Sequence, residues 1–220
     1  MPVITALQLQ TKNQQRVNVF IDGIYGFAVS IDAAATLHQG QALAATEIAA
    51  LEAQDELERA YQSALRYLGA RPRSQAEVKR HLDNKAFDAA CVEAVLQRLT
   101  AQQYLNDQEF AAYWLDNRNR FRPRSAAAVG YELRQRGVDK DTITAALADL
   151  DESAAAWAAV APKVARWREL TQSDLDRKVA TFLARRGFGY DVIRTVSRRA
   201  WTELRTELEP ESELQNEGDE

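Results

Sequence analysis

Arginine side chains beside prolines are the residues of this chain with the most evident binding chemistry. The motif Arg71-Pro72-Arg73-Ser74 recurs letter for letter as Arg122-Pro123-Arg124-Ser125, 51 positions later. A guanidinium group can bind a phosphate or a carboxylate through two parallel hydrogen bonds, and proline restrains the backbone next to it. We interpret the four arginines as candidate contacts for nucleic acid or for acidic groups on a partner protein. The alternative is that they pair with nearby acids or cover helix ends.

Further basic side chains extend this set of candidates. Arg118 and Arg120 precede the second motif at a spacing of two, so they join it in one patch only if the chain is extended there. Arg194 and Arg198 are four residues apart, which places both on one face of a helix. A solvated helix face is the alternative for these positions. The candidate binding residues are Arg71, Arg73, Arg118, Arg120, Arg122, Arg124, Lys178, Arg185, Arg186, Arg194 and Arg198.

The net charge of the chain is −4, but the charge is unevenly distributed. Residues 60–204 carry 24 basic and 18 acidic side chains, whereas residues 1–59 and 205–220 are net acidic, at −4 and −6. Screening in physiological salt limits electrostatic contact to about 10 Å, so a local basic cluster can attract a polyanion although the whole chain is acidic.

Residues typical of catalysis and of metal binding do not form recognisable patterns. The sequence contains no phosphate-binding loop, no G-x-S-x-G, no H-E-x-x-H and no glycine-rich dinucleotide loop. His38 and His81 are single and distant from each other, and the one cysteine, Cys91, fits a small core residue. We therefore expect no enzyme, no cofactor and no metal. No apolar run approaches the roughly 18 residues that span a bilayer, so we expect no membrane partner. A single cysteine excludes an intramolecular disulfide, and a cytoplasmic location is the default expectation. We also expect a monomer.

The residues around the two arginine motifs also recur, which indicates a tandem array. The matched pairs at the same offset are Leu82 with Leu133, Lys85 with Arg136, Phe87 with Val138, Val92 with Ile143, Leu96 with Leu147 and Leu99 with Leu150. A third copy follows 50 positions further on, without the arginine motif, through Leu183, Arg186, Gly187, Phe188 and Ile193. Arrays of one supersecondary unit usually bind partners along extended surfaces.

The predicted fold is mainly α, with three tandem three-helix repeats preceded by a small antiparallel β-sheet. Asp22-Gly23 between two β-prone runs predicts a hairpin, because glycine supplies the positive φ of a tight turn. The expected boundaries are 1–45 for the β-rich segment, 46–103, 104–152 and 153–204 for the repeats, and 205–220 for an acidic, disordered tail.

Several local features of the helices can be predicted. Thr46 is a candidate N-cap, and Ser74 with Glu77 has the spacing of a capping box. Gly137 and Gly187 suit left-handed turns, whereas the equivalent Ala86 suggests a less demanding turn in the first repeat. Residues 154–170 read as one long helix. The tryptophans at positions 114, 157, 167 and 201 lie among apolar residues, which favours core packing over base stacking.

These motifs together resemble the RecX family, regulatory proteins that act on the RecA recombinase filament. The motifs that carry the resemblance span residues 60–200, and a β-rich N-terminal extension over residues 16–30 adds to it. They are Ala64-Leu65-x-Tyr67-Leu68, the first arginine motif with Glu77, Val78 and Leu82, Tyr104-Leu105-Asn106-Asp107-x-x-Phe110-Ala111, and Arg185-Arg186-Gly187-Phe188.

The resemblance implies an array that lies in the groove of a RecA–DNA filament and restrains ATP hydrolysis and strand exchange. The expected partners are then the RecA filament and DNA, single-stranded or duplex, as a secondary contact. Residues 101–150 carry no net charge, so the sequence does not assure a continuous basic strip. The alternatives are a helix-turn-helix-like DNA-binding protein, a helical-repeat interaction scaffold unrelated to DNA, and a hydrolase with unrecognised residues.

Overall fold

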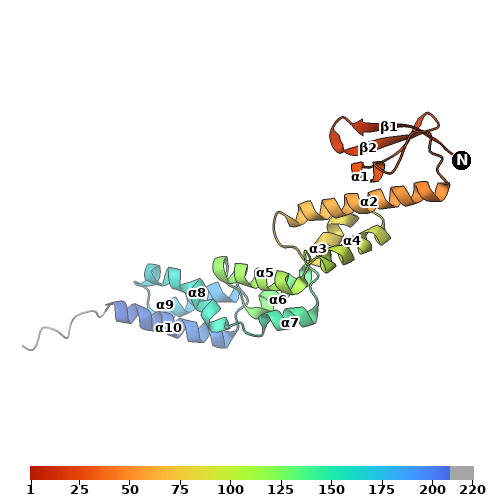
Figure 1. Cartoon of the computed structure of the whole chain (residues 1–220). Helices are drawn as coiled ribbons and strands as arrows, with labels where there is room; N and C mark the ends of the chain where they lie inside the picture. The colour runs from red at the N-terminus through yellow and green to blue at the C-terminus, as the bar shows by residue number, and fades with distance from the viewer. Residues whose placement is uncertain (209–220) are drawn as a thin grey trace, which may run out of the picture. The chain divides into compact units, whose positions relative to one another are not determined.

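The computed structural model describes residues 1–208 of the chain (Figure 1), and it confirms the predicted fold class. The chain divides into two compact units, Met1–Asn106 and the part that begins at Asp107. The first unit contains the sheet and the first helical bundle, and the second contains two more bundles. Most of the expected disordered tail, residues 209–220, lies outside the described residues.

An antiparallel sheet of order β1-β2-β3 begins the first unit, formed by β1 (Ile4–Gln10), β2 (Asn13–Ile21) and β3 (Ile24–Ser30). The predicted hairpin is confirmed, because β2 and β3 are joined by Asp22 and Gly23 alone, with φ of 49° and 85°. Two positive φ values match the right-handed twist of the flanking strands. The inner face of the sheet buries Val17, Val19, Phe27 and Val29 against α1 (Ile31–Ala34) and the start of α2.

Helix α2 (Ala45–Leu68) belongs to two hydrophobic cores. Ile48 and Leu51 in its first half pack against the sheet, whereas Ala60 and Ala64 in its second half are buried in the first helical bundle. The strands and α1 accordingly lie on one side of α2, with α3 and α4 on the other (Figure 1). The first half of α2 therefore serves the sheet, although the first repeat was expected to begin at residue 46.

The start of α2 corrects one prediction, because Thr46 is not its N-cap. Ala44 takes that position, and the Glu47 carboxylate accepts a hydrogen bond from the Ala44 backbone N–H at 2.6 Å. A glutamate at the third position of a helix can accept a hydrogen bond from the backbone N–H of the cap residue, even when the cap side chain has no acceptor of its own.

The first bundle adds α3 (Gln75–Asp83) and α4 (Ala89–Ala101) to the second half of α2. The predicted capping box is confirmed: Ser74 Oγ accepts from the Glu77 N–H at 3.1 Å, and the Glu77 carboxylate accepts from the Ser74 N–H at 3.3 Å. The expectation for Ala86 was wrong. It adopts φ of 59°, the same left-handed turn as Gly137 at 80° and Gly187 at 89°, so the turn is conserved between repeats and only its strain differs.

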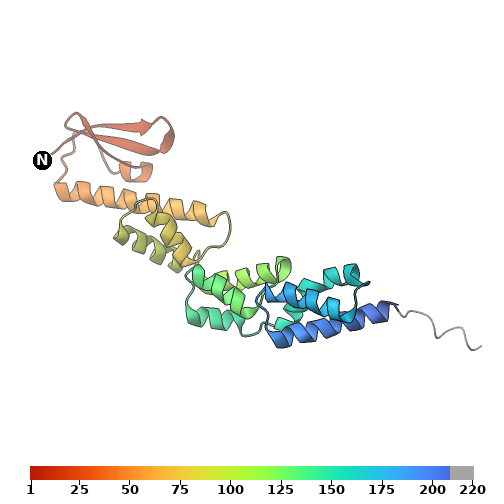
Figure 2. The same ribbon diagram turned by 180° about the vertical axis from the view of Figure 1, so that it is seen from behind.

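The second unit consists of two bundles that follow each other without a linker (Figure 2). Its first bundle contains α5 (Asp107–Phe121), α6 (Ala126–Gln135) and α7 (Lys140–Leu147), with Phe110, Val129 and Leu133 in the core. Its second bundle contains α8 (Glu152–Val164), a 3₁₀ turn at Ala165–Trp167, α9 (Gln172–Ala184) and α10 (Tyr190–Leu208). Core packing of the tryptophans is confirmed, since Trp114 is buried and the other three pack against the last core.

The third repeat departs from the prediction at its first helix. Residues 154–170 do not form one long helix, because α8 ends at Val164 and tightens into the 3₁₀ turn. Thr171 then caps α9, accepting a hydrogen bond from the Asp174 N–H at 3.2 Å. Leu183 lies twelve residues after this cap, whereas Leu133 lies eight after Ser125, so α9 has one extra N-terminal turn where the other repeats have the arginine motif.

None of the helices within residues 1–208 is both long enough and apolar enough to cross a membrane.

We expect Gly187→Ala to destabilise the second unit by about 2 kcal/mol or more. A left-handed φ costs a residue with a Cβ about 1–2 kcal/mol, and here the added Cβ would lie 2.7 Å from Ser125 Oγ and disturb the cap of α6. Gly69→Ala is the matched control, because Gly69 has φ of −61° and its Cβ would meet nothing closer than 3.5 Å. Urea denaturation should show a large shift for the first variant and almost none for the control.

Candidate functional site

The first arginine motif is held by its own repeat. Arg71 Nη2 contacts Glu77 Oε1 at 3.0 Å, and the guanidinium of Arg73 stacks over the Tyr67 ring at 4.1 Å. The Tyr67 ring in turn stacks flat on His81, with 4.1 Å between ring centroids. For this motif the structure favours the alternative reading, in which the arginines pair with neighbours of the same repeat.

The second motif is anchored through a single carboxylate. Glu132 on α6 accepts from Arg118 Nε at 2.6 Å and from Trp114 Nε1 at 2.7 Å, and it forms an ion pair with Arg124 at 3.1 Å. Its side chain is only 14% exposed. Its contacts fix Trp114 and Arg118 on α5 and Arg124 in the turn that follows. Glu132 was not singled out from the sequence.

The contacts that hold the two motifs involve equivalent positions of the two repeats. We call each set an anchor: positions 63, 67 and 81 in the first repeat, and positions 114, 118 and 132, each 51 residues later, in the second. In the first repeat Ser63 Oγ lies 3.2 Å from His81 Nε2, and Tyr67 stacks on His81. In the second repeat Trp114 and Arg118 contact Glu132 instead. The same side-chain triangle therefore exists as an aromatic stack in one repeat and as a charged pair in the next.

The turn between α9 and α10 docks on the second motif. The Ser125 backbone N–H donates to the Arg186 carbonyl at 3.2 Å, and Arg186 Nη1 donates to the Pro123 carbonyl at 2.9 Å. A Cβ on Gly187 would lie 3.1 Å from that of Ala128, so the two turns are in close contact. This contact brings together residues 63 positions apart that the sequence reasoning had placed in separate groups.

The docking creates a cluster of like charges, which we call the arginine junction: Arg122, Arg124 and Arg186. Burial, and then the charges of Arg122 and Arg124, lower the pKa of the Arg186 guanidinium from its usual value. Arg124 has Glu132 as a partner, but Arg122 is exposed and forms no ion pair with any residue from 1 to 208. An anion bound there would relieve the mutual repulsion of the three groups.

Within the described part of the chain, Arg122 has no ion-pair partner because of a difference between the repeats. Its equivalent Arg71 pairs with Glu77, and the position equivalent to Glu77 is Ala128. A long side chain at 128 would collide with the docked Gly187 turn, where contacts are already close. The docking of the third repeat thus excludes the carboxylate that would otherwise neutralise Arg122.

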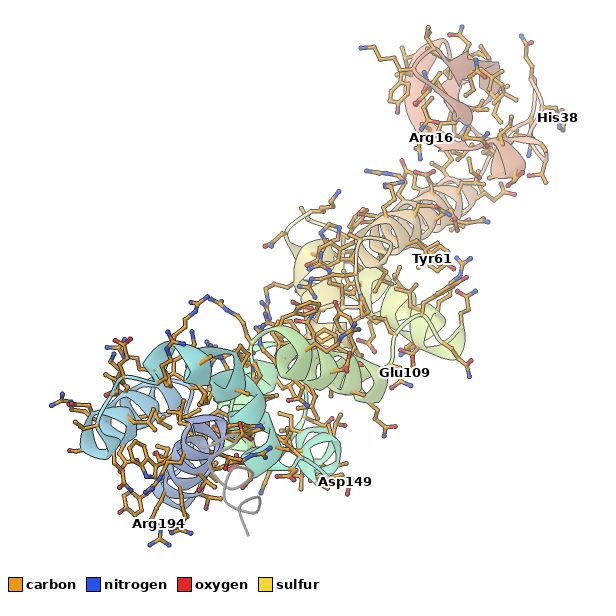
Figure 3. The ribbon with its side chains drawn as sticks, turned by 90° about the vertical axis from the view of Figure 1, so that its left-hand side faces the viewer. Arg16, His38, Tyr61, Glu109, Asp149 and Arg194 are labelled. Atoms are coloured by element: carbon orange, nitrogen blue, oxygen red, sulfur yellow. The ribbon has the colours of Figure 1, made fainter. Side chains whose placement is uncertain are left out.

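The remaining candidates are dispersed. Arg118 and Arg120 both lie on helix α5, so the one extended patch considered for them does not form. Arg194 projects from α10 (Figure 3), 4.0 Å from Asp191, and Lys178, Arg185 and Arg198 are also exposed. Arg71 and Arg73 belong to the first unit, whereas all other candidates belong to the second.

Elsewhere on the surface of residues 1–208 no reaction chemistry is evident. A cavity of about 380 Å³ lies between α5, the end of α7 and α8. It is lined by apolar residues with Asn119, Asp149 and Asp151, and it contains no nucleophile beside a base. Within the described part of the chain, no three His, Cys, Asp or Glu side chains gather to hold a metal ion.

Comparison with known proteins covers all four parts of the chain. The RecX N-terminal domain matches residues 2–43, and the first, second and third three-helix domains of RecX match residues 60–99, 106–147 and 151–196. The regulatory protein RecX of Bacillus subtilis is 33% identical over 198 residues, which cover 88% of this chain and 75% of that protein. The Bacillus licheniformis protein of the same name is 32% identical with the same coverage.

Solved structures agree in fold. A crystal structure of regulatory protein RecX superposes with a TM-score of 0.68 at 24% identity, covering 90% of this chain and all of that one. The structure of RecX from Lactobacillus salivarius gives 0.60 at 18% identity, covering 68% and 99%.

We expect the two anchors to be exchangeable as units. Glu132→His alone should destabilise the second unit by about 1–3 kcal/mol, because it leaves Arg118 and Arg124 without their carboxylate. The double variant Arg118→Tyr with Glu132→His copies the Tyr67–His81 stack and should recover at least half of that loss. Denaturant unfolding of both variants measures this coupling, and a double variant less stable than Glu132→His would contradict the equivalence.

We expect His81 to make the first unit less stable in mild acid. Burial, followed by the charge of Lys85, lowers the pKa of His81 from 6.5, so the unfolded chain binds the proton more readily than the folded one. The stability that depends on neutral His81 is therefore complete above about pH 6.5 and decreases as the pH falls below it. His81→Phe, which copies the equivalent Phe182 of the third repeat, should lose less stability than wild type between pH 7.5 and 5.5. His38→Gln is the control and should lose as much as wild type.

Proposed function

Because the chain belongs to the RecX family of regulatory proteins, we propose that it regulates the RecA recombinase by binding the RecA–DNA filament. The filament repeats one subunit along a helix, and this chain repeats one three-helix bundle. Modest contacts at each bundle then add to a strong overall grip. A ligand that favours one subunit conformation shifts the population toward it, which would slow ATP hydrolysis and strand exchange.

The arginine junction is the observation that supports this proposal most directly. It presents Arg122, which has no ion-pair partner among residues 1–208, at a contact between two repeats, and Arg185 is exposed in the turn docked there. We assign the filament contact to Arg122, Arg185 and Arg186 first, with Arg120, Lys178, Arg194 and Arg198 as further exposed candidates. Arg71, Arg73, Arg118 and Arg124 stabilise their own repeats, and any filament contact would be an additional role.

We further propose that the protein is non-catalytic and cytoplasmic and that it acts as a monomer. We also retain the repeat boundaries 46–103, 104–152 and 153–204 and the N-terminal boundary 1–45 as a proposal. The helical-repeat surface could bind DNA without RecA, and dependence on the recombinase separates this alternative from the main one.

We expect Arg122→Glu combined with Arg185→Glu to abolish the inhibition of DNA-dependent ATP turnover by a preformed RecA filament. Both side chains are exposed and unpaired within residues 1–208, so the variant should keep the wild-type helical content. Arg166→Glu is the control, because Arg166 is exposed before the start of α9, at the other end of this helix from the Arg185-Arg186 turn. A folded double variant that still inhibits would refute the assigned surface, and a wild-type chain without effect would refute the function.

We expect binding to the filament to require nucleotide-bound RecA and to persist at 200 mM salt. Binding governed by phosphate contacts alone should instead lose orders of magnitude in affinity between about 50 and 200 mM salt. A salt titration with and without RecA distinguishes the two, and steep salt dependence that RecA does not change would favour a plain DNA-binding protein.

A further inference from the structure

An exposed aromatic side chain lies beside the arginine junction. Phe121 ends helix α5 directly before the second arginine motif, and 71% of it is exposed. The guanidinium of Arg120 lies 5.7 Å from its ring centroid, and Arg122 follows it in the chain. A single exposed apolar residue is ordinary on a protein surface. A phenyl ring between two exposed arginines, next to a cluster of further arginines, presents two kinds of binding chemistry at one place.

The fold does not require the phenyl ring. The equivalent residue of the first repeat, 51 positions earlier, is Ala70, and the same Arg-Pro-Arg-Ser turn and serine cap form after it. Phe121 is also absent from the buried residues of the surrounding core. Its ring therefore contributes little to the turn and is available for contact with a ligand.

The surrounding charge favours an anionic ligand. Arg120, Arg122 and Arg185 are exposed and form no ion pair among residues 1–208, and Arg186 is held against Pro123 within the same contact. Two carboxylates lie near the second arginine motif, and both already have partners: Glu132 contacts Arg118 and Arg124, and Glu152 accepts a hydrogen bond from the Ala126 N–H at 2.5 Å. Guanidinium groups in such a cluster match phosphate oxygens in charge and geometry.

We propose that Phe121 and the arginine junction form a binding site for single-stranded nucleic acid. The ring stacks on an unpaired base, and Arg122 and Arg186 hold the adjoining phosphates. The inference deepens the proposed function, on which it rests for the partner being a nucleic-acid filament. A duplex is excluded as the main ligand because its bases are stacked within the helix and offer no free face to the ring. An acidic peptide would satisfy the arginines but would leave the phenyl ring without a role.

The experiment measures the binding of the full chain to a fluorescent oligothymidine of about 15 nucleotides and to a duplex of the same length. Phe121→Ala should weaken single-strand binding by about 5- to 150-fold, the range for loss of one stacked base, and should leave duplex binding unchanged. Phe121→Trp should restore single-strand affinity. Arg122→Glu should weaken the binding of both nucleic acids, because it removes a phosphate contact.

The control variant is Tyr131→Ala, since Tyr131 is similarly exposed, at 59%, on the neighbouring helix α6. The proposal is overturned if Phe121→Ala binds oligothymidine like wild type, if Tyr131→Ala loses as much, or if oligoglutamate competes equally well and depends equally on Phe121. The last outcome would identify an acidic peptide as the ligand. Unchanged oligothymidine binding by Phe121→Ala together with normal inhibition of RecA would refute only this inference. Stacking-dependent binding without any effect on RecA would refute only the proposed function.

Discussion

The close contact between the Arg186-Gly187 turn and the second arginine motif determines most of what the second unit can do. It requires a residue without a Cβ, because Gly187 combines φ of 89° with a side-chain direction blocked by Ser125 and Ala128. Two hydrogen bonds, from Ser125 N and from Arg186 Nη1, then fix the turns to each other. The contact removes the carboxylate expected opposite Arg122, places a third guanidinium beside two others, and leaves that charge at the surface. The requirement for glycine at position 187 therefore determines both the packing of the two turns and the charge at the surface.

The repeats preserve the backbone and vary the chemistry that stabilises it. Tyr67 and His81 form an aromatic stack, and their equivalents Arg118 and Glu132 form a salt bridge at 2.6 Å. In the third repeat, Phe182 takes the position of His81 and Glu132 and packs against an apolar core. The left-handed turn shows the same tolerance, with alanine at position 86 and glycine at 137 and 187. A bundle can accept these exchanges because its stability comes mainly from buried leucine and valine side chains, which recur in every copy.

Sequence periodicity predicted the fold well, because each bundle is local: its helices, serine caps and turn glycines lie within about 50 residues and are visible as repeated letters. The partners of the arginines were less predictable. Arg71 pairs six residues away and the pairing could have been read from the capping box, but Arg186 contacts Pro123 at a separation of 63, which depends on how bundles dock. Glu132 could have been found by aligning it with His81, since both face the preceding helix. The helix end at Val164 was missed because residues 165–170 contain no glycine or proline to mark it.

Charged side chains in this array are clustered rather than evenly spread, and this affects how the array could bind a filament. Residues 101–150 carry seven basic and seven acidic side chains, so their composition does not assure a continuous basic strip. The acids, however, are used elsewhere: Glu132 is shared between two arginines inside the bundle, and Asp139 caps α7 through the N–H groups of residues 141 and 142. Near the junction, Glu152 is also engaged, because its carboxylate accepts a hydrogen bond from the Ala126 N–H at 2.5 Å. Screening limits the influence of more distant acids on the three guanidinium groups to about 10 Å. A partner would thus meet a localised cationic cluster in the second unit, and modest contacts at the other bundles would add to its binding.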